Sequence, residues 1–143
     1  MILYIGRFFS DDPSGRFYTD GDGSGEEFRE EVLKPVLTGL PTEKELVINI
    51  DDNVAGYGSS FLVEAFGGLI KHGYFKNEEV RRRLKIEFKD EDFYFYKKKI
   101  MQYIDEAVFD SVPYKSTKKV AISKGYFKEL IDKDFVVSLI KKN

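Results

Sequence analysis

A glycine-rich turn followed by two serines is the part of this chain whose residue types could most directly support chemistry. The segment reads GYGSSFLVEAFGGL and spans Gly56 to Leu69. Its glycines permit a sharp turn, so that Ser59 and Ser60 would lie at the start of an amphipathic helix. Unpaired backbone N–H groups and the helix dipole favour a phosphate there, whether bound or attached to a serine. The structural alternative is a serine that caps a core helix, the commonest use of serine at that position.

Signatures of catalysis are sparse in the rest of the chain. The Gly56–Ser60 turn lacks the GK[ST] ending of a P-loop, and it does not match the G-x-S-x-G elbow of serine hydrolases. Cysteine is absent and His72 is the one histidine, which excludes thiolate nucleophiles, disulfides and sites that need two imidazoles. His72 stands at the end of the predicted helix, which favours a capping role over a role as a base. We therefore expect a protein that is not an enzyme and holds no cofactor. The alternative is an enzyme or nucleotide-binding domain with a phosphate cradle at Gly56–Ser60.

Two adjacent carboxylates, Asp51 and Asp52, follow the short apolar run LVINI of residues 46–50. A run that is almost continuously apolar suits a central strand covered on both faces. Open α/β sheets bind ligands beyond the carboxyl ends of such strands, so the pair is a candidate acidic site. The structural alternative, which we favour, is a polar strand end that leads into a turn.

A second acidic segment resembles a calcium-binding loop. DGDGSG starts at Asp20 and, together with Glu31, matches positions 1, 3, 5, 6 and 12 of an EF-hand. An EF-hand requires a helix before the loop, whereas the preceding PSGRFYT contains a turn and a strand-like run. Position 8 should be apolar, and it is Glu27. We therefore expect a glycine-rich lead into a helix and no metal site. The calcium alternative would use Asp20, Asp22, Ser24 and Glu31.

Charge is distributed unevenly along the chain. Residues 1–70 hold 5 Lys/Arg and 13 Asp/Glu, whereas residues 71–143 hold 18 Lys/Arg and 12 Asp/Glu. The second part contains Arg81–Arg83 and Lys97–Lys99 near Tyr94, and aromatic residues interleaved with cations can bind nucleic acid. Consecutive residues of a helix point to different sides, so such runs are more often solvated. We favour solvated helix faces, with nucleic-acid binding through these two clusters as the alternative.

Length and composition indicate one globular domain. The 143 residues are 42% hydrophobic and 34% charged, a normal balance for a domain that needs no metal or disulfide. No apolar run approaches the roughly 18 residues of a membrane helix. The N-terminal MILYIGRFFSDD lacks the basic region and cleavage site of a signal peptide. We therefore expect a soluble cytoplasmic protein without a membrane partner.

Strand-like and helix-like patterns alternate, which predicts an α/β fold with a mostly parallel or mixed sheet and flanking helices. Ser24 and Glu27 have the spacing of a capping box, Gly39 ends the helix that they begin, and Gly73 ends the next. Helices are predicted at residues 24–39, 59–72, 124–132 and from about 90 to 108. Strands are predicted at residues 2–9, 16–19, 46–50, 84–88, 119–123 and 136–140.

The segment NIDDNVAGYGSSFLVEAFGGLI, Asn49 to Ile70, resembles the bacterial STAS-like family. Members of that family carry a strand, a short glycine-containing loop and then an SSFL-x-E-A-F-G helix. The upstream GRFYTDGDGSGEEFREEVLKPVL is similar to the family's N-terminal part, so the resemblance covers roughly Gly15 to Val108. It implies a STAS-like α/β domain over residues 1–109, with residues 110–143 as a C-terminal extension packed on the same domain.

The resemblance also implies a function, because the family is related to the STAS domains of sulphate transporters and anti-sigma factor antagonists. In antagonist STAS domains a serine at this helix start is phosphorylated by a partner kinase with a histidine-kinase-like ATPase fold, and the phosphate weakens docking. Ser59 matches the phospho-acceptor, and Gly58 and Phe61 stand where the pattern Asp-Ser-Ser-Gly has Asp and Gly. The resemblance thus implies a non-catalytic regulatory or signalling module that binds a protein, with such an ATPase as the candidate partner. Its partner-binding or phospho-acceptor residues would be Tyr57, Gly58, Ser59, Ser60 and Phe61.

Overall fold

Strands and helices alternate along the chain. The computed structural model describes residues 2–128, 134 and 136–138. The strands are β1 (Ile2–Tyr4), β2 (Leu46–Asn49) and β3 (Leu84–Glu87). The labelled α-helices are α1 (Ile5–Phe8), α2 (Gly25–Phe28), α3 (Lys34–Gly39), α4 (Ser59–Leu62), α5 (Gly68–Lys71), α6 (Asn77–Arg83), α7 (Tyr94–Glu106) and α8 (Lys118–Ser123). The shorter turns are 3₁₀ at Tyr18–Asp20 and Glu91–Phe93, and π-helical at Arg29–Leu33 and Val63–Gly67.

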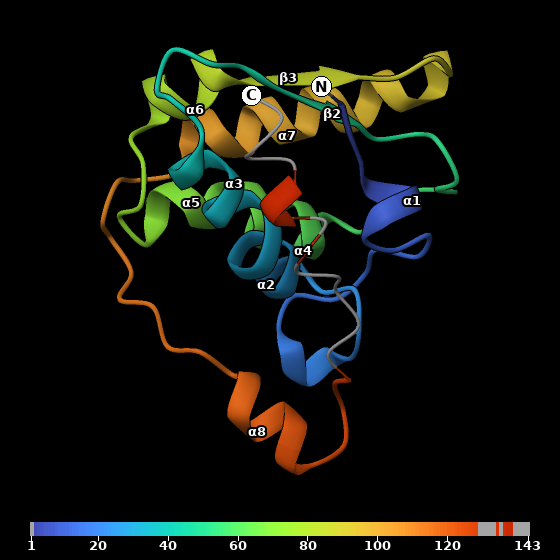
Figure 1. The fold of residues 1–143 in the computed structure, drawn as a ribbon, viewed down its shortest axis with the longest axis vertical. Coiled ribbons are helices and arrows are strands. Elements are labelled where there is room, and N and C mark those ends of the chain that lie inside the picture. The colour runs from blue at the N-terminus through green and yellow to red at the C-terminus, as the bar shows by residue number, and fades with distance from the viewer. Residues whose placement is uncertain (1, 129–133, 135, 139–143) are drawn as a thin grey trace.

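The three strands form one parallel sheet in the order β1-β2-β3. Val47 of β2 pairs with Ile2 on one side and with Lys85 on the other. Figure 1 shows the strands at one end of the molecule, with α2, α3, α4 and α5 gathered below them. The α/β fold class and the parallel sheet are therefore confirmed, and β2 is the central strand, as its apolar run predicted.

One face of the sheet forms the core, and the described residues leave the other face open. Leu46, Ile48 and Ile50 are buried against the helices, whereas on the opposite face Val47 is half-buried and Lys85 is exposed. The prediction that β2 is covered on both faces is therefore wrong. The reason is the strand order: both crossovers step to the next strand in the same direction, and right-handed crossovers then place their helices on the same face.

The N-terminal strand is shorter than predicted. It ends at Tyr4, and residues 5–8 form α1 instead of continuing the strand to residue 9. Gly6 lies so close to the loop after β2 that a Cβ there would be 2.1 Å from the Asp52 carbonyl oxygen. The chain therefore turns off the sheet over this loop, a close approach that only glycine permits.

Three other strand predictions also differ from the structure. Residues 16–19 form a turn, because the Asp20 carboxylate accepts hydrogen bonds from the backbone N–H groups of residues 16 and 17. Residues 119–123 belong to α8, with Ala121 buried. Residues 136–138 are helical, while residues 139–140 lie outside the described residues. Of the helix predicted at 124–132, residues 124–125 form a turn, residues 126–128 are not helical, and the remainder lies outside the described residues.

The two long helices of the core form as the sequence pattern predicts, each interrupted by a π-helical turn. Residues 25–39 begin after Ser24, whose Oγ accepts the backbone N–H of Glu27 at 3.1 Å. The Glu27 carboxylate completes a different bond from the predicted capping box, since it accepts the N–H of Gly23 at 2.8 Å. Residues 59–71 bury the predicted apolar stripe, which consists of Phe61, Leu62, Ala65, Phe66, Leu69 and Ile70.

A close helix–helix contact explains one of the two glycines inside the 59–71 helix. A Cβ on Gly68 would lie 2.4 Å from Nη1 of Arg29, whose side chain is fully buried. Glycine inside a helix costs roughly 1 kcal/mol relative to alanine, and here that cost is offset by the packing of the guanidinium against the helix backbone. Gly67 faces α7, where a Cβ would be 3.6 Å from the Tyr103 carbonyl oxygen.

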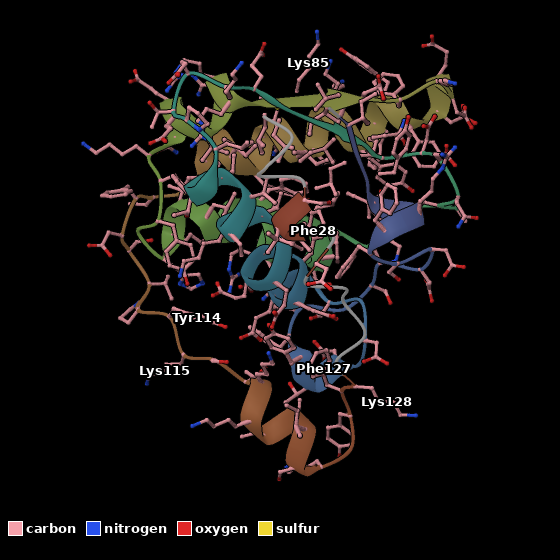
Figure 2. All side chains as sticks on the ribbon, in the orientation of Figure 1. Phe28, Lys85, Tyr114, Lys115, Phe127 and Lys128 are labelled. Carbon is pink, nitrogen blue, oxygen red and sulfur yellow. The ribbon has the colours of Figure 1, made fainter. Side chains whose placement is uncertain are left out.

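Residues 107–117, which we call the strap, run from α7 to α8 along the outside of the core (Figure 1). The N–H groups of Asp110 and Val112 donate to the carbonyl oxygens of Ile70 and Lys71, each at 2.9 Å. Beyond α8, the Phe127 ring packs on Tyr18 with centroids 4.7 Å apart, beside the 3₁₀ turn (Figure 2). Among the described residues, no helix is both long enough and apolar enough to cross a membrane.

Candidate functional site

Ser59 is the first residue of α4, and its side chain is exposed. The cap position is held by Gly58, which has an extended backbone (φ −78°, ψ 146°) and contributes no side-chain cap. The next residue, Ser60, is half-buried. Within the described residues, neither serine hydroxyl makes a hydrogen bond. The structural alternative, in which one of these serines caps the helix, is therefore wrong.

The loop before Ser59 is held by aromatic packing. The Tyr57 hydroxyl donates to the carbonyl oxygen of Ile50 at 2.6 Å, which ties the loop to the end of β2. The Tyr57 ring lies 5.4 Å from that of Tyr96 and 5.8 Å from that of Phe61. Burial, with a smaller effect of the Asp51 charge, raises the pKa of Tyr57 well above its ordinary value, so the hydroxyl stays a donor. The loop is thus fixed in one conformation.

Phe61 is not a partner-binding residue, because its side chain is fully buried. Its ring packs on Phe28 and Phe9, with centroids 6.0 and 6.3 Å away. Helical spacing could have indicated this, since Phe61 begins the apolar stripe that faces the core. Tyr57 is also largely inward-facing. The exposed residues of this region are Asn53, Ala55, Gly58 and Ser59.

Asp51 and Asp52 have separate structural roles. One Asp51 oxygen accepts the backbone N–H groups of Lys89 and Asp90, at 2.6 and 2.7 Å. Asp52 forms an ion pair with Arg7 of α1. These contacts join the end of β2 to the segments after β3 and β1, which agrees with a polar strand end rather than an acidic site.

The four residues of the calcium alternative each bond to different groups of the fold and do not converge on one site. Asp20 holds the 3₁₀ turn, Ser24 caps the first long helix, and Asp22 accepts the N–H of Lys128 at 2.8 Å. Glu31 accepts from the Tyr18 hydroxyl and from Lys118. No cluster of acidic residues and histidine in the described part of the chain has the arrangement of a metal site. The DGDGSG segment instead leads into the helix that Ser24 caps, and its Asp22 contacts the backbone of the distant Lys128.

The basic clusters are engaged with neighbouring groups. Arg81 pairs with Asp105, and Arg82 donates to the Thr42 carbonyl oxygen. Arg83 is buried and bonds to Glu79 and to the backbone of residues 40, 41 and 44. The three lysines of residues 97–99 each lie 5.6 to 5.9 Å from an aromatic ring centre on or near α7. The arginine cluster is therefore part of the fold and not a free basic surface.

Sequence reasoning missed a buried carboxylate at the start of α2. Glu26 is fully buried and accepts four hydrogen bonds. The donors are the Tyr18 N–H, the Tyr114 hydroxyl at 2.6 Å, and the N–H and hydroxyl of Thr117, the latter also at 2.6 Å. Together with the Glu31–Lys118 pair, these bonds attach the strap and α8 to the acidic helix. The donors to Glu26 are neutral groups far away in the sequence, so no local pattern signalled this contact.

The side chains that an enzyme at the Gly56–Ser60 turn would need do not converge. Asp51 and Asp52 line a hollow on the open side of the sheet, and His72 lines another hollow beside the strap. Ser59 lines neither of them. The candidate acid and base residues therefore lie in hollows that Ser59 does not share, which offers the enzyme alternative no support.

Comparison with known families supports one assignment. Residues 24–92 match the family described as a STAS-like domain of unknown function (DUF4325). No curated protein and no solved structure gives a significant match to the chain. The matched segment contains β2, the Ser59 turn, the 59–71 helix and β3, and it lies inside the region of resemblance noted in the sequence. The match therefore confirms the STAS-like resemblance for residues 24–92, just under half of the chain.

Proposed function

We propose that the chain is a non-catalytic regulatory module that binds a protein partner through the 53–58 loop and the start of α4. The observation that carries the proposal is the Ser59 hydroxyl, which is exposed and bonded to no described group. A hydroxyl without a structural role is available to contact a partner or to accept a phosphate. The match to a STAS-like domain is consistent with a regulatory module. The sequence resemblance to antagonist STAS domains separately aligns their phospho-acceptor with Ser59.

The rigidity of the loop supports a role in recognition. Tyr57 is bonded to the end of β2 and packed between two rings. A Cβ on Gly56 would lie 2.7 Å from the Tyr96 hydroxyl oxygen, so the loop backbone is in close contact with α7. A surface that is already ordered loses little conformational entropy on binding. The small exposed residues Ala55, Gly58 and Ser59 would also let a partner approach the backbone.

Phosphorylation of Ser59 would act as a switch on this surface. A phosphate adds about −1.5 to −2 charges and three acceptor oxygens. The start of a helix tolerates that charge, because it lies at the positive end of the helix dipole. A partner shaped for the neutral hydroxyl would have to desolvate the phosphate without a matching cation, which weakens docking. The partner class that we propose is an ATPase with the histidine-kinase-like fold.

The test is a paired measurement of phosphorylation and affinity. A partner captured with the wild-type chain is purified, incubated with the chain and ATP, and the modified residue is identified by mass spectrometry. Calorimetry then compares the wild-type chain with the Ser59→Asp and Ser59→Ala variants. We expect phosphate on Ser59, at least about tenfold weaker binding of Ser59→Asp, and unchanged binding of Ser59→Ala.

Ser123→Asp provides the matched control. Ser123 is also exposed, but it lies on α8, so the same change of charge should leave partner binding unaltered. Equal affinities for wild type and Ser59→Asp would contradict the proposed surface. Equal weakening by both substitutions would mean that overall charge, and not the site, controls binding.

A further inference from the structure

A pocket lies between the end of the 59–71 helix and the strap. Its volume is about 330 Å³, which is within the range of small-molecule sites. One wall consists of Glu64, Lys71 and His72, and the facing wall includes Tyr114 and Lys115 of the strap. Figure 2 shows Tyr114 and Lys115 on the strap between the core and α8. The pocket is separate from the Ser59 surface, since neither Ser59 nor any residue of the 53–58 loop lines it.

The charged groups around this pocket favour an anion. Lys71 and Lys115 line it, and no described carboxylate pairs with either of them. The one carboxylate in the wall, Glu64, is already neutralised: Nη1 of Arg29 donates to it at 2.6 Å, and Nε of Arg16 lies 3.7 Å from its second oxygen. The pocket therefore has two uncompensated ammonium groups.

His72 presents one edge of its ring to the same place. Its Nδ1 lies 2.8 Å from the Val112 carbonyl oxygen, and because a carbonyl only accepts, Nδ1 carries the hydrogen. Nε2 lies 3.6 Å from Glu64, which also lines the pocket. The contact with Val112 ties the ring to the strap.

Arg29, behind this wall, has an unsatisfied donor. Its Nε donates to Glu30 at 2.9 Å, and its Nη1 donates to Glu64. Nη2 is buried and has no acceptor, the one such side-chain atom among the described residues. The guanidinium centre lies 5.0 Å from the centre of the Tyr114 ring, which lines the pocket. A buried donor without an acceptor is costly, but Arg29 does not line the pocket and forms no part of the proposed site.

The remaining lining is apolar. Phe17 and Val112 line the pocket and are exposed, at 38% and 44% of their full area. Pro113 and the Tyr114 ring extend the same surface. An apolar wall next to two ammonium groups suits a ligand with two parts, a charged head and a hydrophobic body.

We propose that this pocket binds a small organic anion, namely a carboxylate or phosphate group carried on an aromatic or aliphatic body. Lys71 and Lys115 hold the anionic group, and Phe17, Val112 and Tyr114 contact the body. The strap supplies one complete wall, so the ligand bridges the STAS-like segment and the C-terminal part of the chain. The proposal does not depend on the partner-binding role of Ser59.

Four probes test the proposal on the full chain by isothermal calorimetry and by amide chemical shifts. Phenyl phosphate and benzoate should bind saturably and shift the amides of residues 64–72 and 112–117. Inorganic phosphate, which lacks the body, should bind more weakly, and benzamide, which lacks the charge, should not bind. Preference between the two ring-bearing anions identifies phosphate or carboxylate as the natural head group. Absence of saturable binding by both would overturn the proposal, and so would equal binding of benzamide.

Matched lysine pairs separate a built site from general attraction. The double variant Lys71→Gln/Lys115→Gln should weaken the better anion about tenfold or more, because it removes both ammonium groups. The control Lys119→Gln/Lys124→Gln removes the same charge from α8 and the turn after it and should leave affinity unchanged. Equal losses in the two pairs would show nonspecific attraction and contradict the proposed site. Thermal melting without ligand checks that both variants are folded.

Discussion

The two long helices of the core each begin near a serine, and the two serines have different roles. Ser24 is fully buried, and its hydroxyl oxygen accepts the N–H of Glu27 at 3.1 Å. Ser59 is exposed, and the cap of its helix is the backbone of Gly58. The residue type and the place in the helix are nearly the same. Burial decides which hydroxyl belongs to the fold and which is available to another molecule.

The surroundings of the two helix starts differ in the same way. At the first helix, Glu26 collects four donors from the 3₁₀ turn and the strap, so that helix start is covered by the chain itself. At the second helix, Tyr57 of the 53–58 loop packs inward on Tyr96 and Phe61. Asn53, Ala55 and Gly58 of the same loop are exposed. The first start is therefore internal structure, and the second is a candidate surface for a partner.

Of the substitutions that test this comparison, Glu26→Ala should lower the free energy of unfolding the most. The substitution leaves the N–H groups of Tyr18 and Thr117 without their acceptor, and we expect a loss of about 3 kcal/mol in the free energy of unfolding. Urea denaturation measures the loss, and hydrogen exchange should show faster exchange of the strap amides. Glu43→Ala, at an exposed loop position, is the control. Unchanged strap exchange in Glu26→Ala would mean that other contacts hold the strap.

Replacement of Glu27 by glutamine should change the free energy of unfolding by an amount that depends on pH. Burial, more than any other cause, raises the pKa of Glu27 to about 7 in the folded protein. The unfolded chain has a pKa near 4.3, so the native state holds the proton more tightly and stability falls as pH rises from about 4.5 to about 7. Glu27→Gln should therefore raise the free energy of unfolding by about 2 kcal/mol at pH 8 and change it little at pH 5.

Chemical denaturation at the two pH values measures this difference. Glu45→Gln removes a charge at an exposed position and should show no comparable pH dependence. A gain of equal size at pH 5 and pH 8 would indicate that the carboxyl group of Glu27 is not protonated within the fold at pH 5.

Substitution of the buried cap, Ser24→Ala, should lower the free energy of unfolding by about 1 kcal/mol, because the Glu27 N–H loses its acceptor. Ser24→Asp keeps an acceptor and would test the geometry, although burial of its charge opposes it. Thermal and urea unfolding of Ser24→Ala provide the value. A stability equal to that of wild type would show that the Ser24 hydroxyl does not stabilise the start of its helix, contrary to its proposed structural role.

Substitution of the exposed serine, Ser59→Ala, should have the smallest effect, within about 0.5 kcal/mol of wild type. Its hydroxyl makes no hydrogen bond within the described residues, so its removal breaks no bond in the fold. The same unfolding measurement as for Ser24→Ala gives a direct comparison. A loss near 1 kcal/mol would show that Ser59 supports its helix after all.

Several features of the fold could be predicted from the sequence because they depend on neighbouring residues. The apolar run at 46–50 became the central strand, and the stripe from Phe61 to Ile70 became the buried face of a helix. Ser24 caps the first long helix as its spacing indicated. Periodicity and capping act over a few residues, so the sequence carries them directly. The position of Ser59 at a helix start followed from the same local signals.

The tertiary structure alone decided the features that depend on distant residues. Glu26 meets Tyr114 and Thr117, which are 88 and 91 positions away, and the short β1 results from the approach of Gly6 to Asp52. The open face of the sheet follows from the strand order, which no local pattern encodes. By itself, the sequence determined the central strand, the two long core helices and the position of Ser59 at a helix start, but it placed strands at 16–19 and 119–123 that do not form. Contacts between remote segments determined what covers the apolar stripe that begins at Phe61 and left the neighbouring Ser59 exposed, because exposure depends on what packs against a residue.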